Sequence, residues 1–185
     1  MGVSTLQMVW TKTRLECVKL VNMGGIIMRI NKYSTRLDDN MTTILVKENS
    51  CNYSCVDNLN QPERIVSLMN DVFRASSQAE EYVWALALNA KCKPIGVFEI
   101  SHGTVNMSVL QPREVFVRLC LCGASSFIIV HNHPSGDAFP SEYDNNATIR
   151  LKEAGTMMGI EMLDHVVIGQ NYYSYREETG LWKKQ

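Results

Sequence analysis

Two histidines, a serine and an aspartate have the residue types and the spacing that a catalytic metal site needs. His131 and His133 form an H-x-H pair, and after seven further residues Ser141 and Asp144 form S-x-x-D. Two imidazoles and one carboxylate give a zinc ion three protein ligands and leave its fourth position for water, as in catalytic zinc sites. A single histidine is usually packed or solvated, and S-x-x-D alone is usually a helix cap. The combination predicts a metal site that activates water.

The local sequence also predicts how these side chains are positioned. Residues 127–130 are aromatic or β-branched, which favours a buried strand that leads into His131. Residues two apart in a strand face the same side, so the imidazoles of His131 and His133 can point to one place. A loop rich in proline and glycine then leads to Ser141, a good helix N-cap, with Asp144 in the first turn. We therefore expect Asp144 to lean toward the histidines.

Apolar periodicity elsewhere predicts alternating helices and strands. A helix from residue 62 carries a stripe of Ile65, Leu68, Met69 and Val72, which we assign to the core rather than to a partner surface. The alternation indicates an α/β fold, a mixed sheet with flanking helices. We expect further helices at 112–121 and 141–158, and strands at 82–89, 95–101, 126–131, 160–168 and 172–176.

The first 61 residues differ from the rest of the chain. Residues 28–61 form a polar lead-in, with short strands predicted near 42–47 and 53–56. Residues 1–27 contain short apolar patches broken by charged residues. We expect this segment to be poorly ordered, or to be an extension that precedes a natural start at Met28.

Charge and hydropathy exclude several classes of protein. The formal net charge is −1 without a long basic run, which counts against direct nucleic-acid binding and against a polybasic membrane patch. No apolar run approaches the ~20 residues that cross a bilayer, and none has the form of a secretory signal. We therefore expect a cytoplasmic protein with reduced thiols and no membrane partner. The cysteines lack the paired spacing of a zinc ribbon, and Cys120 and Cys122 are expected in the core.

The H-x-H and S-x-x-D pattern resembles the JAMM (MPN-plus) metallopeptidase motif, and several short sequence segments around it resemble the RadC branch of that family. The resemblance covers residues 62–182. It implies a JAB/MPN domain, a deaminase-like three-layer sandwich with Zn²⁺ at the rim of the sheet. It also implies a peptide or protein substrate that carries an amide or isopeptide bond. The matching segments are HNHPSG at 131–136, GT at 103–104, PRE at 112–114 and LDHVVIG at 163–169.

The same resemblance places a glutamate at the head of the first buried strand as the general base. A metal hydrolase needs such a carboxylate close to the attacking water. Glu81 occupies that position, whereas its neighbour Glu80 would point to the other side of the strand. Glu99, in the middle of the following strand, remains an alternative base.

The resemblance implies a zinc-dependent hydrolase of amide bonds. His131, His133 and Asp144 would hold the zinc ion. Glu81 would take the proton of the attacking water and return it to the leaving amine. The hydroxyl of Ser141 would help to stabilise the oxyanion, while it also caps the helix.

Other interpretations remain open. The family's association with DNA repair suggests a DNA-associated role, but the near-neutral charge and the lack of a recognisable helix-hairpin-helix region count against direct DNA binding. A non-catalytic protein-binding module would have lost metal ligands, and here all three are present. Asp164 and His165 have two interpretations: His165 packs inside with Asp164 holding its tautomer, or the pair supports the metal ligands or a substrate groove. The sequence does not indicate an oligomeric state.

Overall fold

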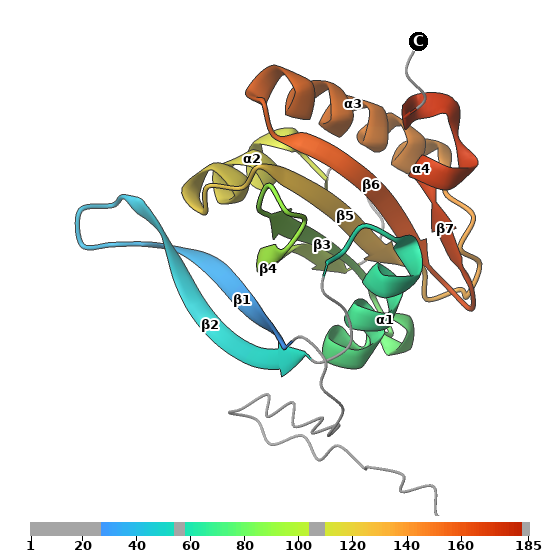
Figure 1. Ribbon diagram of the computed structural model, residues 1–185, viewed down its shortest axis with the longest axis horizontal. Coiled ribbons are helices and arrows are strands. Elements are labelled where there is room, and N and C mark those ends of the chain that lie inside the picture. The colour runs from blue at the N-terminus through green and yellow to red at the C-terminus, as the bar shows by residue number, and fades with distance from the viewer. Residues whose placement is uncertain (1–26, 54–57, 104–109, 183–185) are drawn as a thin grey trace, which may run out of the picture.

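A seven-stranded mixed sheet forms the middle of the molecule (Figure 1). The computed structural model describes residues 27–53, 58–103 and 110–182. The strands are β1 (Met28–Leu37), β2 (Thr43–Tyr53), β3 (Glu81–Leu88), β4 (Pro94–Gly103), β5 (Ser126–Asn132), β6 (Glu161–Ile168) and β7 (Tyr172–Ser174). Their order in the sheet is β2-β1-β4-β3-β5-β6-β7. β3 is antiparallel to both β4 and β5, whereas β5 and β6 are parallel.

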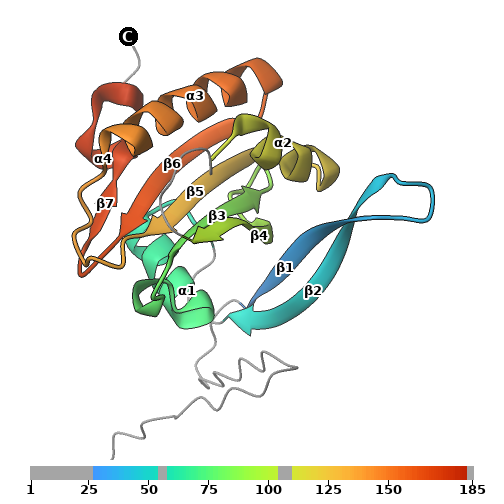
Figure 2. The same ribbon diagram turned by 180° about the vertical axis from the view of Figure 1, so that it is seen from behind.

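Helices cover both faces of this sheet and produce three layers (Figure 1 and Figure 2). Helix α1 (Pro62–Phe73) lies on one face, and helices α2 (Pro112–Leu121) and α3 (Glu142–Met158) lie on the other. Successive residues of a strand face opposite sides, so Trp84 packs on the side of α1 while Val83 packs on the side of α2 and α3. The predicted α/β fold, a mixed sheet with flanking helices, is confirmed.

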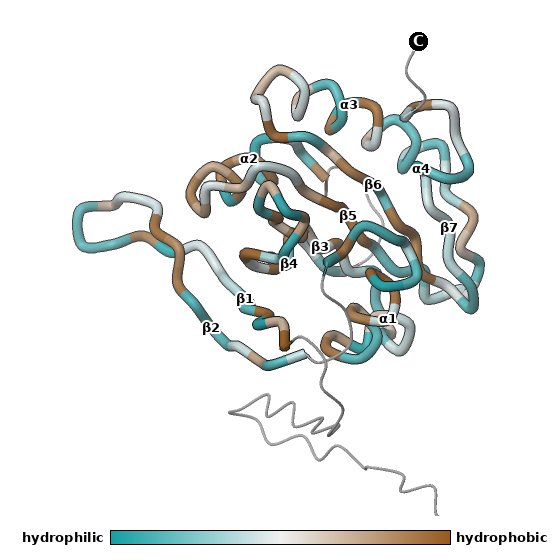
Figure 3. The backbone as a smooth tube through the Cα atoms, viewed as in Figure 1, coloured by the Kyte–Doolittle hydropathy of each residue, from teal (hydrophilic) through white to brown (hydrophobic). Residues whose placement is uncertain are grey.

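A long hairpin of β1 and β2 extends the sheet at one edge and projects from the body (Figure 1). It was expected as a polar lead-in with short strands, but the two strands have 10 and 11 residues. β1 joins β4 only through the pairs Lys32↔Val97 and Tyr33↔Phe98. Few residues of the hairpin are buried, so the apolar alternation that signals a strand is weak, and Figure 3 shows it mostly white or teal where β5 is mostly brown. The proposed extension at 1–27 lies outside the described residues, apart from Ile27. The strand predicted near 53–56 also lies outside them, apart from Tyr53.

The strand predicted at 172–176 ends earlier than expected, at Ser174. The Ser174 hydroxyl accepts a hydrogen bond from the backbone N–H of Glu177 (3.3 Å) and so caps the short helix α4 (Tyr175–Glu178). The N–H of Arg176 donates to the buried carboxylate of Asp164 (3.0 Å) rather than to a neighbouring strand. A local cap therefore overrides the apolar pattern that suggested a longer strand.

Two further expectations concern the helices. Among the described residues, no helix has both the length and the apolar content needed to cross a bilayer. Cys120 was expected in the core, but it is exposed, whereas Cys122 is half-buried. The reason is that α2 buries Val115, Phe116 and Leu119, and the residue after Leu119 lies about 100° around the helix.

Candidate metal centre

The end of β5 carries the two histidines to the rim of the sheet. β5 is buried along its whole length, and His131 is its next-to-last residue. The backbone N–H of His133 donates to the carbonyl of Ile168 (2.8 Å), so the chain stays beside β6 for one more residue. The imidazoles of His131 and His133 therefore lie together, with their Nε2 atoms 3.0 Å apart.

The first turn of α3 brings a carboxylate to the same place. Ser141 is the N-cap, and its hydroxyl accepts from the N–H of Asp144 (3.2 Å) while the Asp144 Oδ2 accepts from the N–H of Ser141 (2.8 Å). This reciprocal capping box holds the Asp144 side chain against the helix end. Asp144 Oδ1 then lies 3.5 Å from His131 Nε2, and Oδ2 lies 3.8 Å from His133 Nε2.

Strand β3 adds a glutamate because of its antiparallel register with β5. Val83 is opposite His131, and Glu81 precedes Val83 by two residues on the same face of the sheet. One ligand atom from each of Glu81, His131, His133 and Asp144 lies within 4.8 Å of all the others. The structure thus brings together the three predicted ligands and the predicted base.

The spacing of these atoms fits a small tetrahedral ion. The separations between His131 Nε2, His133 Nε2 and the Asp144 oxygens are 3.0, 3.5 and 3.8 Å. Bonds of about 2.0–2.1 Å to a tetrahedral zinc ion would place ligand atoms about 3.3 Å apart. Two imidazole nitrogens with a carboxylate oxygen are also a donor set that Zn²⁺ accepts. The residues present therefore fit a zinc ion with one position left for water.

The surroundings of the imidazoles favour the form that binds a metal. His133 Nδ1 lies 2.7 Å from the carbonyl oxygen of Asp137. A carbonyl only accepts, so Nδ1 carries the proton and Nε2 presents its lone pair to the centre. Burial lowers the pKa of His131 to about 4, although the charge of Asp144 opposes this shift. His131 is therefore neutral near pH 7 and able to ligate.

Glu81 has the properties of a base that works beside such an ion. Its side chain is only partly exposed at the start of β3. Burial raises the pKa of the Glu81 carboxyl, while His133 opposes the shift and Asp144 adds to it. A carboxyl group with a raised pKa takes and returns a proton more easily near neutral pH than an ordinary glutamate.

Glu99, the alternative base, lies away from the metal ligands. Its Oε2 accepts from Lys32 Nζ (3.0 Å) and its Oε1 lies 2.9 Å from His102 Nδ1. In the register of β3 and β4, Glu99 is opposite Trp84, whose ring packs in the core on the side of α1. Of the two candidate bases, the fold brings only Glu81 to the histidines.

The hydroxyl proton of Ser141 points to the candidate ligand Asp144 and not to the place of a substrate. Ser141 Oγ donates to Asp144 Oδ2 (2.6 Å) as well as accepting from the Asp144 N–H. The predicted donation to an oxyanion would require Ser141 to leave this carboxylate when substrate binds. In the geometry observed, Ser141 orients the Asp144 side chain through this hydrogen bond.

Ser141→Ala is therefore expected to weaken metal binding and not only turnover. Loss of the cap should lower the free energy of unfolding by about 1 kcal/mol, and loss of the bond to the carboxylate should lower zinc affinity by about 10–100-fold. Denaturant unfolding and competition with a chromogenic chelator measure the two effects. Ser141→Thr keeps the hydroxyl and serves as the control. Unchanged zinc affinity in Ser141→Ala, with reduced turnover, would show that the hydroxyl acts on the substrate alone.

Asn132 is a residue of this site that the sequence did not single out. It lies between the two histidines and is 1% exposed. Its Oδ1 accepts from the N–H of Tyr82 (2.8 Å), and its Nδ2 donates to the carbonyl of Glu80 (3.0 Å). These two bonds bracket Glu81 and fasten the start of β3 to the end of β5. A fully polar side chain at the end of a buried strand was the only signal that could have identified it.

Asn132→Ala should separate positioning of the base from metal binding. We expect turnover to fall by up to about 10²-fold, because small displacements of a catalytic group have effects of this size. Zinc affinity should stay close to that of the unchanged protein, since no ligand is touched. Asn89→Ala is the matched control, because Asn89 accepts from the backbone N–H groups of Lys91 and Lys93 at the other end of β3. Equal loss in both variants would mean that Asn132 has no special role.

A close approach of two turns holds the loop between the ligands. The carbonyl of Gly136 accepts from the N–H of Gln170 (2.7 Å) in the turn that joins β6 and β7. A Cβ atom on Gly169 would overlap the Gly136 carbonyl and the backbone nitrogen of Ala138. Residue 169 must therefore be glycine for the loop around Gly136 to pack against the β6–β7 turn. This explains why the LDHVVIG segment ends in glycine next to the candidate metal centre.

Asp164 and His165 have different roles. The Asp164 carboxylate accepts from the Ser174 hydroxyl (2.6 Å) and from the N–H groups of His165 (2.7 Å) and Arg176 (3.0 Å). It does not hold the ring of His165, so the expectation that it sets that tautomer is wrong. The ring of His165 instead lies between His131 and Thr148. Asp164 fastens β6 to the β7–α4 turn, and of the two residues His165 alone contacts a candidate metal ligand, His131.

A rim of a mixed sheet that presents two histidines, an aspartate and a nearby glutamate defines a JAB-type domain with a candidate metal centre. The chain matches the family model of the RadC-like JAB domain over residues 59–181. It therefore belongs to the RadC-like JAB domain family, and the predicted membership is confirmed.

Several similar proteins carry the name UPF0758 protein. The one from Desulforudis audaxviator is 41% identical over 121 residues, which cover 65% of this chain and 52% of that protein. The one from Alkaliphilus metalliredigens is 43% identical over 122 residues, with coverages of 65% and 52%. The one from Caldanaerobacter subterraneus subsp. tengcongensis is 38% identical over 165 residues, with coverages of 89% and 68%. This chain thus spans about half the length of the first two relatives.

Proposed function

We propose that this chain is a zinc-dependent hydrolase of amide bonds in peptides or proteins. The observation that carries the proposal is the convergence of Glu81, His131, His133 and Asp144 within 4.8 Å at the rim of the sheet. Structural zinc sites are usually closed by four ligands that are rich in cysteine. Here three side chains suffice to hold the ion, and the fourth is a carboxylate suited to acid–base chemistry.

Each side chain has a role that follows from its surroundings. When bound, a zinc ion lowers the pKa of its water from 15.7 to about 7 and polarises a carbonyl group. His131, His133 and Asp144 would hold the ion at the rim of the sheet. Glu81 accepts the proton of the attacking water and returns it to the leaving nitrogen, so that the amine departs neutral. Ser141 keeps the Asp144 carboxylate in place and donates to the oxyanion only if that bond is exchanged.

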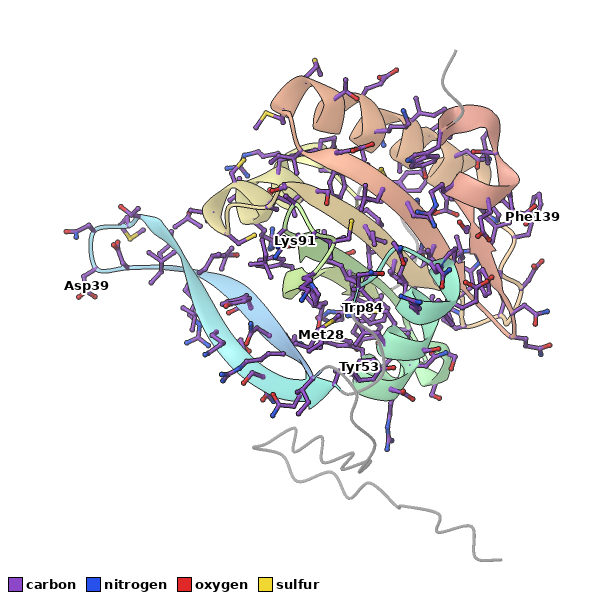
Figure 4. All side chains as sticks on the ribbon, viewed as in Figure 1. Met28, Asp39, Tyr53, Trp84, Lys91 and Phe139 are labelled. Carbon is purple, nitrogen blue, oxygen red and sulfur yellow. The ribbon has the colours of Figure 1, made fainter. Side chains whose placement is uncertain are left out.

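A groove formed by the loop that follows His133 supports a peptide as the substrate. It has a volume of about 480 Å³ and lies between the loop after His133 and the β6–β7 turn. Phe139 is 71% exposed there, its ring lies edge-on to that of Tyr173 at 5.8 Å, and Figure 4 shows it at the outer edge beside β7. Asp137 lines the groove and also holds His133. A groove with aromatic and polar walls suits both the side chains and the backbone of a peptide.

The experiment that tests this proposal is a cleavage assay on the zinc-loaded protein. Peptide libraries and isopeptide-linked peptides are incubated with the protein and analysed by mass spectrometry. We expect cleavage that stops when a chelator removes zinc and returns when zinc is restored. The two substrate sets decide between peptide and isopeptide bonds. A protein that retains one zinc ion per chain but cleaves neither set would be a binding module rather than a hydrolase.

The proposal also includes a cytoplasmic location and no direct contact with nucleic acid. In the part of the chain that the structure describes, Cys92, Cys120 and Cys122 form no disulfide, which suits a reducing compartment. The net charge of −1 offers little attraction for phosphates. Binding of duplex DNA whose strength falls steeply as salt increases would contradict this part of the proposal.

A further inference from the structure

We propose that Thr148 and His165 are positioning residues that decide which ring nitrogen of His131 carries its proton. They form a chain of hydrogen bonds that begins at the backbone carbonyl of Asp144 and ends at His131. The inference deepens the proposed metal centre. It depends on His131 being a metal ligand but not on the hydrolysis of any substrate.

The first step is the hydroxyl of Thr148, which is buried at 0% exposure. Thr148 Oγ1 lies 2.6 Å from the carbonyl oxygen of Asp144, one helical turn earlier in α3. It also lies 2.6 Å from His165 Nδ1. The hydroxyl has a single proton, and a carbonyl can only accept. If that proton did not go to Asp144, two oxygen lone pairs would face each other at 2.6 Å, so Thr148 donates to Asp144.

The second step is the ring of His165, which is also fully buried. Because the proton of Thr148 is used, Thr148 accepts from His165 Nδ1–H. His165 is 0% exposed, and its hydrogen-bond partners in the described residues are a hydroxyl and another imidazole, so a positive charge on the ring would be buried beside no carboxylate and the ring is neutral with one proton. The other nitrogen, Nε2, is therefore an acceptor.

The third step is His131, whose Nδ1 lies 2.8 Å from His165 Nε2. Since His165 Nε2 accepts, His131 Nδ1 carries a proton and donates it. His131 Nε2 is then the nitrogen left for a metal ion. It lies 3.0 Å from His133 Nε2, so the two lone pairs can face each other only with an ion between them. A ring nitrogen of a histidine can donate or accept a hydrogen bond, so His165 alone does not fix the direction of its bond to His131. The hydrogen bonds of Thr148 fix that direction.

The opposite arrangement of protons would block metal binding. If Thr148 donated to His165 Nδ1, His165 Nε2 would carry a proton and donate to His131 Nδ1. His131 Nε2 would then be protonated and would point an N–H at the centre, where an ion needs a lone pair. One hydroxyl orientation therefore separates a ligand-competent histidine from an incompetent one.

The surrounding packing holds the chain of bonds in one geometry. The ring of Tyr175 stacks on His165 with centroids 5.0 Å apart and an angle of 12° between the planes. Its hydroxyl donates to Asn145 Oδ1 (2.8 Å) in the first turn of α3. In the described part of the chain, the ring nitrogens of His165 have hydrogen-bond partners only in His131 and Thr148. The same helix thus supplies the ligand Asp144 and the hydroxyl that prepares His131.

The test compares Thr148→Val, which removes the hydroxyl but keeps the shape, with Thr148→Ser, which keeps the hydroxyl. Thr156→Val is the matched control, because Thr156 makes the same bond to a carbonyl four residues earlier in α3, at an exposed position (Thr156 Oγ1 to Lys152 O, 3.0 Å). Zinc affinity is measured by chelator competition. The tautomers of His131 and His165 are read from long-range ¹H–¹⁵N correlations of the imidazoles in the metal-free protein near pH 7.

We expect both histidines of the unchanged protein to carry their proton on Nδ1. Thr148→Val should lower zinc affinity by about 10–100-fold, the usual effect of losing a residue behind a ligand, and should shift His131 toward the Nε2–H form. Thr148→Ser and Thr156→Val should match the unchanged protein in both measurements.

Three results would overturn the inference: an Nε2–H tautomer of His165 in the unchanged protein, an unaffected Thr148→Val, or equal losses in Thr148→Ser and Thr148→Val. The first of these needs no variant, so it decides the matter even if Thr148→Val does not fold. A protein that shows the expected tautomers and zinc affinities but cleaves nothing would refute the proposed hydrolase and leave this inference standing.

Discussion

Purified protein is expected to hold about one zinc ion per chain after zinc is offered and the excess removed, and His133→Ala and Asp144→Ala are each expected to lose it. Both residues supply an atom to the cluster whose members lie within 4.8 Å of one another. Two remaining ligands hold a tetrahedral ion poorly. The loss of affinity should exceed the roughly 10–100-fold effect of removing a residue that only supports a ligand. Metal analysis by mass spectrometry measures the zinc content.

His102→Ala is the control for a histidine outside the centre. Its side chain is 56% exposed and contacts Glu99. We expect His102→Ala to keep its zinc. Unfolding curves of all three variants show whether a loss of zinc follows from a loss of fold. This measurement matters most for Asp144→Ala, because that variant also loses the capping box. An unchanged protein that takes up no zinc would contradict the metal centre and with it the proposed hydrolase.

Glu81→Gln is expected to keep zinc and to lose hydrolysis. The amide retains the shape of the side chain but cannot take a proton from water, and general acid–base catalysis usually contributes about 10²–10⁴-fold to the rate. Turnover should fall by a factor in that range once a cleaved substrate has been identified. The zinc content of the variant, measured beside the rate, separates loss of the base from loss of the ion.

Two neighbouring glutamates provide the controls. Glu80→Gln changes the adjacent residue, and Glu99→Gln changes the alternative base, which is paired with Lys32 in this structure. Both variants should hydrolyse at close to the unchanged rate. Full activity in Glu81→Gln, or a large loss in Glu99→Gln with zinc retained, would reject Glu81 as the base.

The local sequence was sufficient for the parts of the centre that depend on neighbouring residues. The buried strand that ends in His131, the shared side of His131 and His133, and the cap formed by Ser141 and Asp144 all follow from short-range rules. β5 (Ser126–Asn132) and α3 (Glu142–Met158) begin and end within one residue of the predicted bounds. The helix–strand alternation likewise predicted the α/β class, because apolar periodicity is a local property.

Only the tertiary structure decided the features that depend on pairing across the chain. The choice between Glu81 and Glu99 follows from the register that sets Val83 opposite His131, and no local pattern encodes that register. The hairpin of β1 and β2 has few buried residues, so its sequence lacks the strong apolar alternation that predicts a strand. Thr148 meets His165 across 17 positions of sequence, where a helix crosses a neighbouring strand. Residues that act behind a candidate ligand are recognised by contact rather than by type. The sequence therefore indicated the candidate ligands, and the fold determined which residues contact them.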